Sequence, residues 1–213
     1  MSDYNKLMGG FKAFKATVYN EKKDALGHVF KLGIKPTTLF ITCCDLKISP
    51  DTIFSGNPGE LYVFRNMAAI VPPYSEEGAN ANGIVAAIEY GVKNLAVENV
   101  VVLGHAKCDG IKLLMSDDDE SKNSSAMKGW LEIAEEARDA VKNELADKTI
   151  EEQESACEHE TILVSLKNLL TYPFVEERIK NNQLKIYGWH FNIESGELMA
   201  FDPETKFFEL VSC

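Results

Sequence analysis

The stretch NVVVLGHAKC, residues 99–108, decides the fold of this chain. Its first seven residues predict a strand, because the apolar, β-branched side chains between Asn99 and His105 are typical of a strand buried on both faces of a parallel sheet. Immediately before it, in residues 81–95, apolar side chains recur at helical spacing. A helix that leads into a buried strand belongs to a β-α-β unit, whose crossover we expect to be right-handed.

Further strands are predicted on both sides of this unit. The run TTLFITC (residues 37–43) follows Pro36, and LYVFRN (residues 61–66) follows an Asn-Pro-Gly turn. Near the end of the chain, LKIYGWHFNI and ELMAFDPETKFFEL flank the turn at residues 194–197. These two runs predict a hairpin or an edge pair that completes the sheet.

Three other segments are expected to be helical. Residues 1–32 mix apolar and charged side chains at helical spacing and predict an N-terminal helical arm. Residues 126–146 and 150–170 predict two helices that cover the sheet, each with acidic residues near its start. We therefore expect one α/β domain over residues 1–213, with a mainly parallel central sheet flanked by helices, an N-terminal helical arm and antiparallel or edge strands at the C-terminal end.

The composition excludes several classes of partner. A net charge of −11 and a pI near 4.9 provide no basic field for nucleic acid or for an anionic membrane surface. No apolar run approaches the ~20 residues that would span a bilayer. The five cysteines are an odd number, and the first residues do not resemble a signal peptide. These features predict a cytoplasmic protein with reduced thiols.

Cys43, His105 and Cys108 form a candidate zinc site. Each lies at or just beyond the end of an apolar run, and the carboxyl ends of parallel strands meet at one edge of a sheet. Two thiolates and an imidazole suit zinc, and three protein ligands leave the fourth tetrahedral position open, as in catalytic sites. Buried thiols and a loop histidine would be the alternative. The cysteine and the acidic residue that follow a separate strand favour the metal site over this alternative, with one zinc ion per chain.

The other cysteines, histidines and acidic residues considered as ligands are not expected to bind a metal ion. Cys44 follows Cys43 directly, so its side chain is expected on the opposite face of the strand. The polar loop around residues 117–120 lacks the ligand periodicity of a calcium loop and is expected to be solvated. His28, His159 and His190 have no cysteine or carboxylate at ligand spacing and are expected to be surface or helix histidines and not metal ligands. His190 follows Trp189 in a predicted strand and could shuttle protons only if the fold brings it near the site.

Several motifs resemble those of β-class carbonic anhydrases, and the likeness extends over nearly the whole chain. The family pattern C-x-D-x-R with a following proline corresponds to CCDLK at residues 43–47 and Pro50. The others are PGELYVFRN at residues 58–66, AIEY at 87–90, GHAKC at 104–108, SLKNLLTYPFV and GWHFNIESGEL. The resemblance implies reversible hydration of carbon dioxide to bicarbonate and a proton through a zinc-bound hydroxide, with the three candidate ligands on the metal.

The resemblance also implies roles for other residues. Asp45 accepts a hydrogen bond from the zinc-bound hydroxide, and its partner in the motif is Lys47. Tyr62, Met67 and Tyr90 match positions that line the substrate pocket, often from the neighbouring subunit, although such residues are core residues by default. The implied assembly is a homodimer or a dimer of dimers, and the implied partner is a small-molecule substrate.

Four positions depart from the family pattern. Lys47 replaces the arginine that clamps the aspartate, and a point charge on a flexible stem replaces a planar fork. Ile34 replaces a substrate-facing glutamine, Asp109 replaces a glycine beside the pocket, and Ala69 replaces an asparagine. We expect these changes to leave carbon dioxide hydration in place at a reduced rate.

Two alternatives stay open from the sequence. The first keeps the zinc chemistry and changes the substrate to carbonyl sulfide or carbon disulfide, which an apolar Ile34 would suit. The second is a catalytically silent homologue with a binding or regulatory role, in which zinc contributes folding free energy. Arg65 and Asn66 are expected to hold the end of their strand and not to contact substrate.

Overall fold

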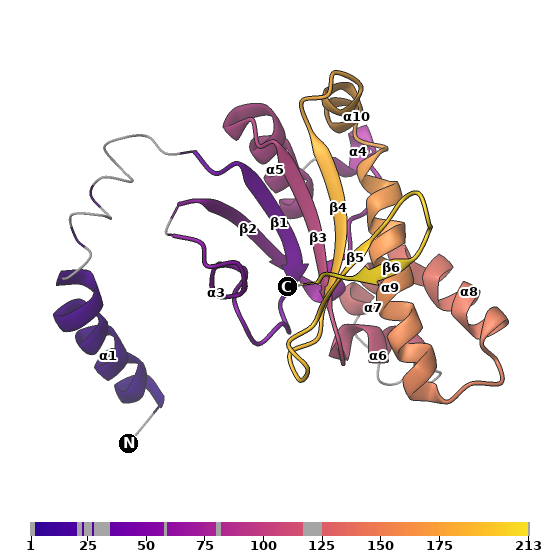
Figure 1. Cartoon of the computed structure of the whole chain (residues 1–213), viewed down its shortest axis with the longest axis horizontal. Helices are drawn as coiled ribbons and strands as arrows, with labels where there is room; N and C mark the ends of the chain where they lie inside the picture. Colours follow the sequence, from indigo (N-terminus) through magenta and orange to yellow (C-terminus); the bar gives the residue numbers. More distant parts are fainter. Residues whose placement is uncertain are drawn as a thin grey trace.

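A sheet of six strands, in the order β2-β1-β3-β4-β5-β6, forms the centre of the computed structural model (Figure 1). The structure describes residues 3–20, 23, 27, 35–57, 59–79, 82–116 and 125–212. The strands are β1 (Thr38–Cys43), β2 (Leu61–Asn66), β3 (Asn99–His105), β4 (Lys185–Phe191), β5 (Leu198–Phe201) and β6 (Phe208–Leu210). This architecture confirms the predicted α/β fold.

The first four strands are parallel, and β4, β5 and β6 continue the sheet by antiparallel pairing. Cys43 pairs with Asn66 at the end of β1, and His105 pairs with Phe191 at the end of β3. Because β1 and β3 are adjacent and parallel, both strands end at the same edge of the sheet. This edge carries the candidate site.

The two faces of the sheet bury alternate residues of each strand. Leu39 and Ile41 of β1 belong to one apolar cluster, together with Val100 and Val102 of β3, whereas Phe40 belongs to the other. This period of two is the reason why a continuous apolar run forms a strand covered on both sides.

Helices and short helical turns make up much of the rest of the described chain. They are α1 (Asp3–Phe14), η1 (Lys15–Tyr19), α3 (Pro50–Ile53), η2 (Met67–Ala69), α4 (Glu76–Ala79), α5 (Gly83–Glu89), η3 (Tyr90–Leu95), α6 (Asp109–Met115), α7 (Ser125–Leu131), η4 (Glu132–Ala134), α8 (Glu135–Glu144), α9 (Ile150–Leu169) and α10 (Pro173–Lys180). The start of α9 is fixed by a capping box between Thr149 and Glu152. Proline in the first turn starts α10.

One predicted helix is divided in the structure. The segment expected to be a single helix over residues 126–146 consists of α7 and α8 joined by the 3-10 turn η4. Leu131 and Ala134 are both buried at this turn. Because side chains three residues apart eclipse each other in a 3-10 turn, this geometry directs both into the core.

Two glycines let α9 approach the sheet closely. A Cβ atom at Gly104 would lie 2.7 Å from Ile162 Cδ1, and one at Gly188 would lie 2.7 Å from Ile162 Cγ2. Both distances are shorter than real Cβ contacts, so larger residues would push the helix outward. The long helix α9 is therefore seated against β3 and β4 (Figure 1).

The N-terminal helix α1 stands apart from the rest of the chain (Figure 1). None of its residues is buried, although its large apolar side chains recur at helical spacing. These exposed side chains are Tyr4, Leu7, Met8, Phe11 and Phe14. Within the predicted arm of residues 1–32, the structure confirms helix from Asp3 to Tyr19, and most of the later residues lie outside the described ranges. In the described parts of the chain, no helix has the length and apolar character needed to cross a membrane.

Candidate metal centre

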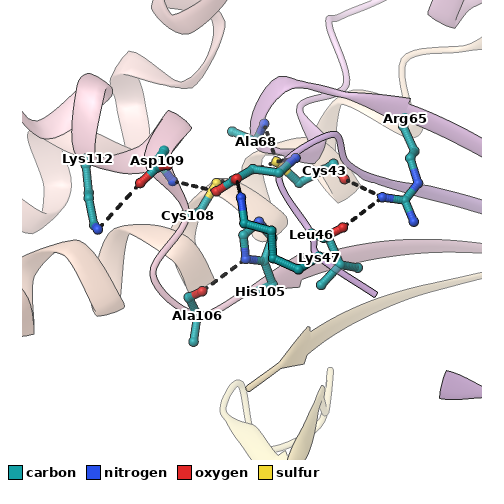
Figure 2. Close-up of polar contacts among 11 residues, drawn as sticks. Cys43, Leu46, Lys47, Arg65, Ala68, His105, Ala106, Cys108, Asp109 and Lys112 are labelled. Carbon is teal, nitrogen blue, oxygen red and sulfur yellow. Dashed lines mark hydrogen bonds and ion pairs between the residues drawn. The ribbon is translucent and has the colours of Figure 1, made fainter. Parts of the chain in front are cut away.

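The three predicted ligands come together at the edge of the sheet. Cys43 is the last residue of β1, His105 the last residue of β3, and Cys108 the residue before α6. Their ligand atoms all lie within 4.8 Å of one another, and all three residues are buried. Figure 2 shows their side chains grouped at one place.

The backbone explains how His105 and Cys108 can face one point. Lys107, between them, adopts the left-handed conformation with φ of 57°. A single left-handed residue turns the chain sharply, so that Cys108 returns beside the strand end that carries His105. Lys107 itself points to solvent and forms an ion pair with Glu194 of the β4–β5 turn at 2.7 Å.

The donor set fits zinc. His105 Nδ1 lies 3.0 Å from the Ala106 carbonyl oxygen, so Nδ1–H donates there and Nε2 keeps a lone pair. Nε2 is buried and has no hydrogen-bond partner among the described residues. The two sulfur atoms are 3.6 Å apart. Two zinc–sulfur bonds of about 2.3 Å at the tetrahedral angle require a separation of about 3.8 Å, close to the one observed.

The Cys43 and Cys108 side chains contact each other through their sulfur atoms. The hydrogen bond from the Cys108 thiol lowers the pKa of Cys43 to about 4, and the same contact raises the pKa of Cys108. The amide groups of Asp45 and Ala68 also donate to Cys43 Sγ, at 3.3 and 3.2 Å. These donors favour the thiolate form of Cys43, which is the form that binds a metal ion.

Asp45 is held beside the ligands by two donors. Its Oδ1 forms an ion pair with Lys47 Nζ, and its Oδ2 accepts a hydrogen bond from the Asp109 amide at 3.2 Å (Figure 2). The hydrogen bond from Lys47 is the main reason why the pKa of Asp45 is lowered. The carboxylate of Asp109 lies 3.5 Å from Lys112 Nζ, so Asp109 contributes its amide to the site while its side chain pairs elsewhere.

Arg65 fixes the loop that carries this pair. Its guanidinium donates to the carbonyl oxygens of Leu46 at 2.9 Å, Ile48 at 3.2 Å and Cys43 at 3.4 Å. The Asn66 side chain likewise donates to the Ile70 carbonyl at 2.9 Å. Both contacts agree with the prediction that these residues hold the end of β2.

The predicted substrate-pocket residues are not all near the ligands. Tyr62 packs edge-on against Tyr90 with 6.0 Å between ring centroids, and it pairs with Leu39, at the other end of β1 from Cys43. Met67 directly precedes Ala68, whose amide donates to Cys43 Sγ, and it lines a cavity of about 460 Å³. Ile34 lies outside the described residues.

Two residues that the sequence analysis did not assign to the site contact it. Glu158 of α9 accepts a hydrogen bond from the Cys108 amide at 3.0 Å, and its other oxygen lies 2.9 Å from His190 Nε2. The expectation of a surface or helix histidine is wrong for His190, which is buried in β4 because this strand is covered by α9. His159 does lie on a helix, and His28 is outside the described residues.

A sequence signal for Glu158 exists. Glu158, Ile162, Ser165 and Leu169 recur at helical spacing, and all four are buried. A carboxylate within an otherwise uncharged buried stripe is an exception to the usual exposure of glutamate. Such an exception points to a buried partner.

Comparison with known proteins identifies the family. The model of the carbonic anhydrase family matches residues 38–198, which is most of the chain. This chain belongs to the β-class carbonic anhydrases. It is 36% identical over 203 residues to β-carbonic anhydrase 3 of Arabidopsis thaliana, covering 94% of this chain and 78% of the relative. It is 34% identical to a carbonic anhydrase of Helicobacter pylori, covering 94% and 91%.

Solved carbonic anhydrases of the β class share the fold. The structure of the β-carbonic anhydrase CcaA superposes with a TM-score of 0.91 at 30% identity, covering 99% of this chain and all of that one. A tetrameric β-carbonic anhydrase from Sordaria macrospora gives a TM-score of 0.77 at 25% identity, with 98% of each chain covered. The resemblance read from the sequence is thereby confirmed, and zinc is the metal of this family.

Proposed function

We propose that this β-carbonic anhydrase reversibly hydrates carbon dioxide to bicarbonate and a proton at one zinc ion held by Cys43, His105 and Cys108. The observation that carries the proposal is the buried Nε2 of His105, which has no hydrogen-bond partner in the described parts of the chain and lies beside two sulfur atoms 3.6 Å apart. Zinc bound by three protein ligands supplies a water molecule whose pKa falls toward ~7, and so a nucleophile at neutral pH.

The residues around the ligands orient the reactants. Asp45, with one oxygen on Lys47 and the other on the Asp109 amide, is placed to accept a hydrogen bond from the attacking group and to fix its direction. Lys47 holds the Asp45 carboxylate with a single charge, on a side chain that is 70% exposed. We infer a rate below that of a relative with a bidentate arginine at this position.

Stopped-flow carbon dioxide hydration by the zinc-loaded protein, from about pH 6.5 to 9, tests this function and brackets the water pKa near ~7. We expect turnover that rises with pH. The same protein with Cys43→Ser provides the inactive reference, and Cys44→Ser provides the matched control on the neighbouring residue. A protein with one zinc per chain and no turnover at any pH would favour the silent homologue instead.

We also propose a homodimer or a dimer of dimers in the cytoplasm. The exposed apolar residues of α1 give that helix a surface for a second copy, and Tyr62 and Tyr90 lie away from the ligands of their own chain. They would then line the pocket of the partner, as in the family. The pair Leu7→Asp and Phe11→Asp should lower the mass measured by light scattering. Two unbonded thiols at the metal centre suit a reducing compartment.

A further inference from the structure

A buried carboxylate lies directly beside the metal centre. Glu158 is in the middle of α9, its side chain is only 4% exposed, and it lines the same small cavity as Cys43, His105 and Cys108. Taking a carboxylate out of water costs several kcal/mol, so its position requires compensating partners. One of these partners belongs to a metal ligand, because the Cys108 amide donates to Glu158.

Both oxygens of Glu158 are used. Oε1 accepts the hydrogen bond of the Cys108 amide at 3.0 Å, and Oε2 accepts that of His190 Nε2 at 2.9 Å. The first contact joins residues 50 positions apart in the sequence, and it acts on the backbone of a ligand. Fixing the amide of Cys108 limits the positions that its Sγ can take.

The histidine that holds Glu158 is itself enclosed. The ring of His159 packs edge-on against His190, with 4.5 Å between centroids, and stacks on Phe208 of β6 at 4.3 Å. The His190 side chain is only 7% exposed. Water therefore competes little for the contact between His190 and Glu158, and hydrogen bonds to a carboxylate are the stronger kind in such surroundings.

Stability alone does not account for this pair. Replacing both partners of a buried hydrogen bond by well-packed apolar residues of similar volume is often nearly neutral for stability, or stabilising. An apolar residue cannot, however, accept the hydrogen bond of the Cys108 amide. The close approach of α9 to β3 and β4, permitted by Gly104 and Gly188, brings the carboxylate within reach of that amide.

We propose that Glu158 is a positioning residue for the zinc ligand Cys108, and that His190 holds Glu158 in place. The carboxylate fixes the amide of Cys108. The Cys108 sulfur is thereby kept close enough to Cys43 and His105 for all three to bind one zinc ion. This inference rests on the proposed zinc site. Partners of this kind behind metal ligands typically change metal affinity by 10–100-fold when they are removed.

The test compares zinc affinity in a set of full-length variants. Glu158→Leu removes the acceptor, Glu158→Gln keeps one oxygen, and Glu154→Gln makes the same neutralisation one turn earlier on α9. Chelator competition gives the zinc dissociation constant. We expect Glu158→Leu to bind zinc 10–100-fold more weakly, Glu158→Gln to lie between it and the wild type, and Glu154→Gln to match the wild type.

The histidine provides a second pair of variants. In His190→Gln the side-chain amide replaces the Nε2–H donor, whereas His190→Val has no donor. We expect His190→Gln to bind zinc as tightly as the wild type and His190→Val to bind it more weakly, as Glu158→Leu does. Loading with cobalt gives a spectroscopic readout, because the thiolate-to-cobalt absorption band responds to the position of Cys108 sulfur. The band should shift in Glu158→Leu and His190→Val, and stay unchanged in His190→Gln and Glu154→Gln.

Two outcomes would overturn the inference. If all folded variants bind zinc as the wild type does and keep the same cobalt band, Glu158 has a packing role only. Should Glu158→Leu fail to fold, Glu158→Gln and the His190 pair decide the matter by the same readouts. If the wild-type protein itself does not bind zinc, the proposed function fails with the inference, so the two failures are distinct.

Discussion

Lys47 and Asp45 form an ion pair beside the metal centre, and its two ends differ in exposure. The lysine side chain is 70% exposed and the aspartate side chain 14%. The carboxylate is thus held from the protein side by the Asp109 amide and from the solvent side by a flexible ammonium group. Lys47 can therefore leave its partner without disturbing the core, which a buried two-pronged clamp could not do.

The first prediction concerns this pair. Lys47 holds Asp45 through one flexible, solvent-exposed charge, and the Asp109 amide holds the same carboxylate, so Lys47→Met should lower kcat/KM for carbon dioxide hydration by less than about 5-fold. Lys47→Arg should raise it, because a planar guanidinium can hold the carboxylate in one orientation. Stopped-flow hydration measures both. Lys93→Met makes the same charge change away from the site and should have no effect.

The second prediction separates the two adjacent cysteines. Cys43→Ser should abolish stoichiometric zinc binding, because it removes a buried thiolate that faces His105 and Cys108. Cys44→Ser should retain one zinc per chain, since Cys44 is exposed. Elemental analysis of the purified proteins gives the ratio. Equal zinc contents in the two variants would contradict the assignment of Cys43 as a ligand.

The parallel strands could be predicted because their signal is local. The bounds of β2 and β3 agree with the predicted strands at residues 61–66 and 99–105. The middle of β3 is apolar because both faces are covered, whereas β2 is a half-buried strand at the edge of the sheet and ends in Arg65 and Asn66. The division between α7 and α8 could not be predicted, because a 3-10 turn keeps nearly the same pattern of buried residues as a helix.

The metal ligands could also be predicted from local signals, whereas Glu158 and His190 behind them could not. Each ligand lies at or just after a predicted strand, so strand order alone brings them together. Glu158 is 50 residues from Cys108 and 32 from His190, and these contacts depend on where α9 lies against the sheet. That placement depends on Gly104 and Gly188, whose role appears only when the helix is in position.

The third prediction tests this close packing. Gly188→Ala should destabilise the protein by about 1–3 kcal/mol, the usual cost of overpacking. A Cβ there would meet Ile162 Cγ2 at 2.7 Å and Leu166 Cδ1 at 2.9 Å. Gly104→Ala should cost less, because the nearest atom is the mobile Cδ1 end of Ile162. Urea unfolding gives both free energies.

A double-mutant cycle identifies the source of the strain. Ile162→Ala removes the nearest atom that each new Cβ would meet and leaves Leu166 Cδ1 beside position 188. Gly188→Ala combined with Ile162→Ala should therefore be less destabilised than the sum of the two single changes. Strict additivity would mean that Ile162 is not the obstacle and that Leu166 or the backbone of β4 resists the change.

The fourth prediction follows from the burial of His159. Burial, with a smaller contribution from repulsion by His190, lowers the pKa of His159 to about 4 from the ordinary value of 6.5. The unfolded chain therefore binds this proton at a higher pH than the folded protein does, and stability falls as the pH drops from about 6.5 to about 4. Between pH 7 and pH 5 the loss from this one group should be about 2 kcal/mol.

His159→Phe isolates this contribution, since a phenyl ring can keep the stacking on Phe208 and has no proton to bind. Urea unfolding of both proteins at pH 7 and pH 5, with zinc in the same excess, gives four free energies. Titrating groups away from His159 contribute equally to both proteins and cancel in the comparison, whereas the coupling of His159 to the neighbouring His190 is counted with His159. The wild type should lose about 2 kcal/mol more than His159→Phe over this interval. Equal losses would mean that His159 binds its proton as readily in the folded protein as in the unfolded chain.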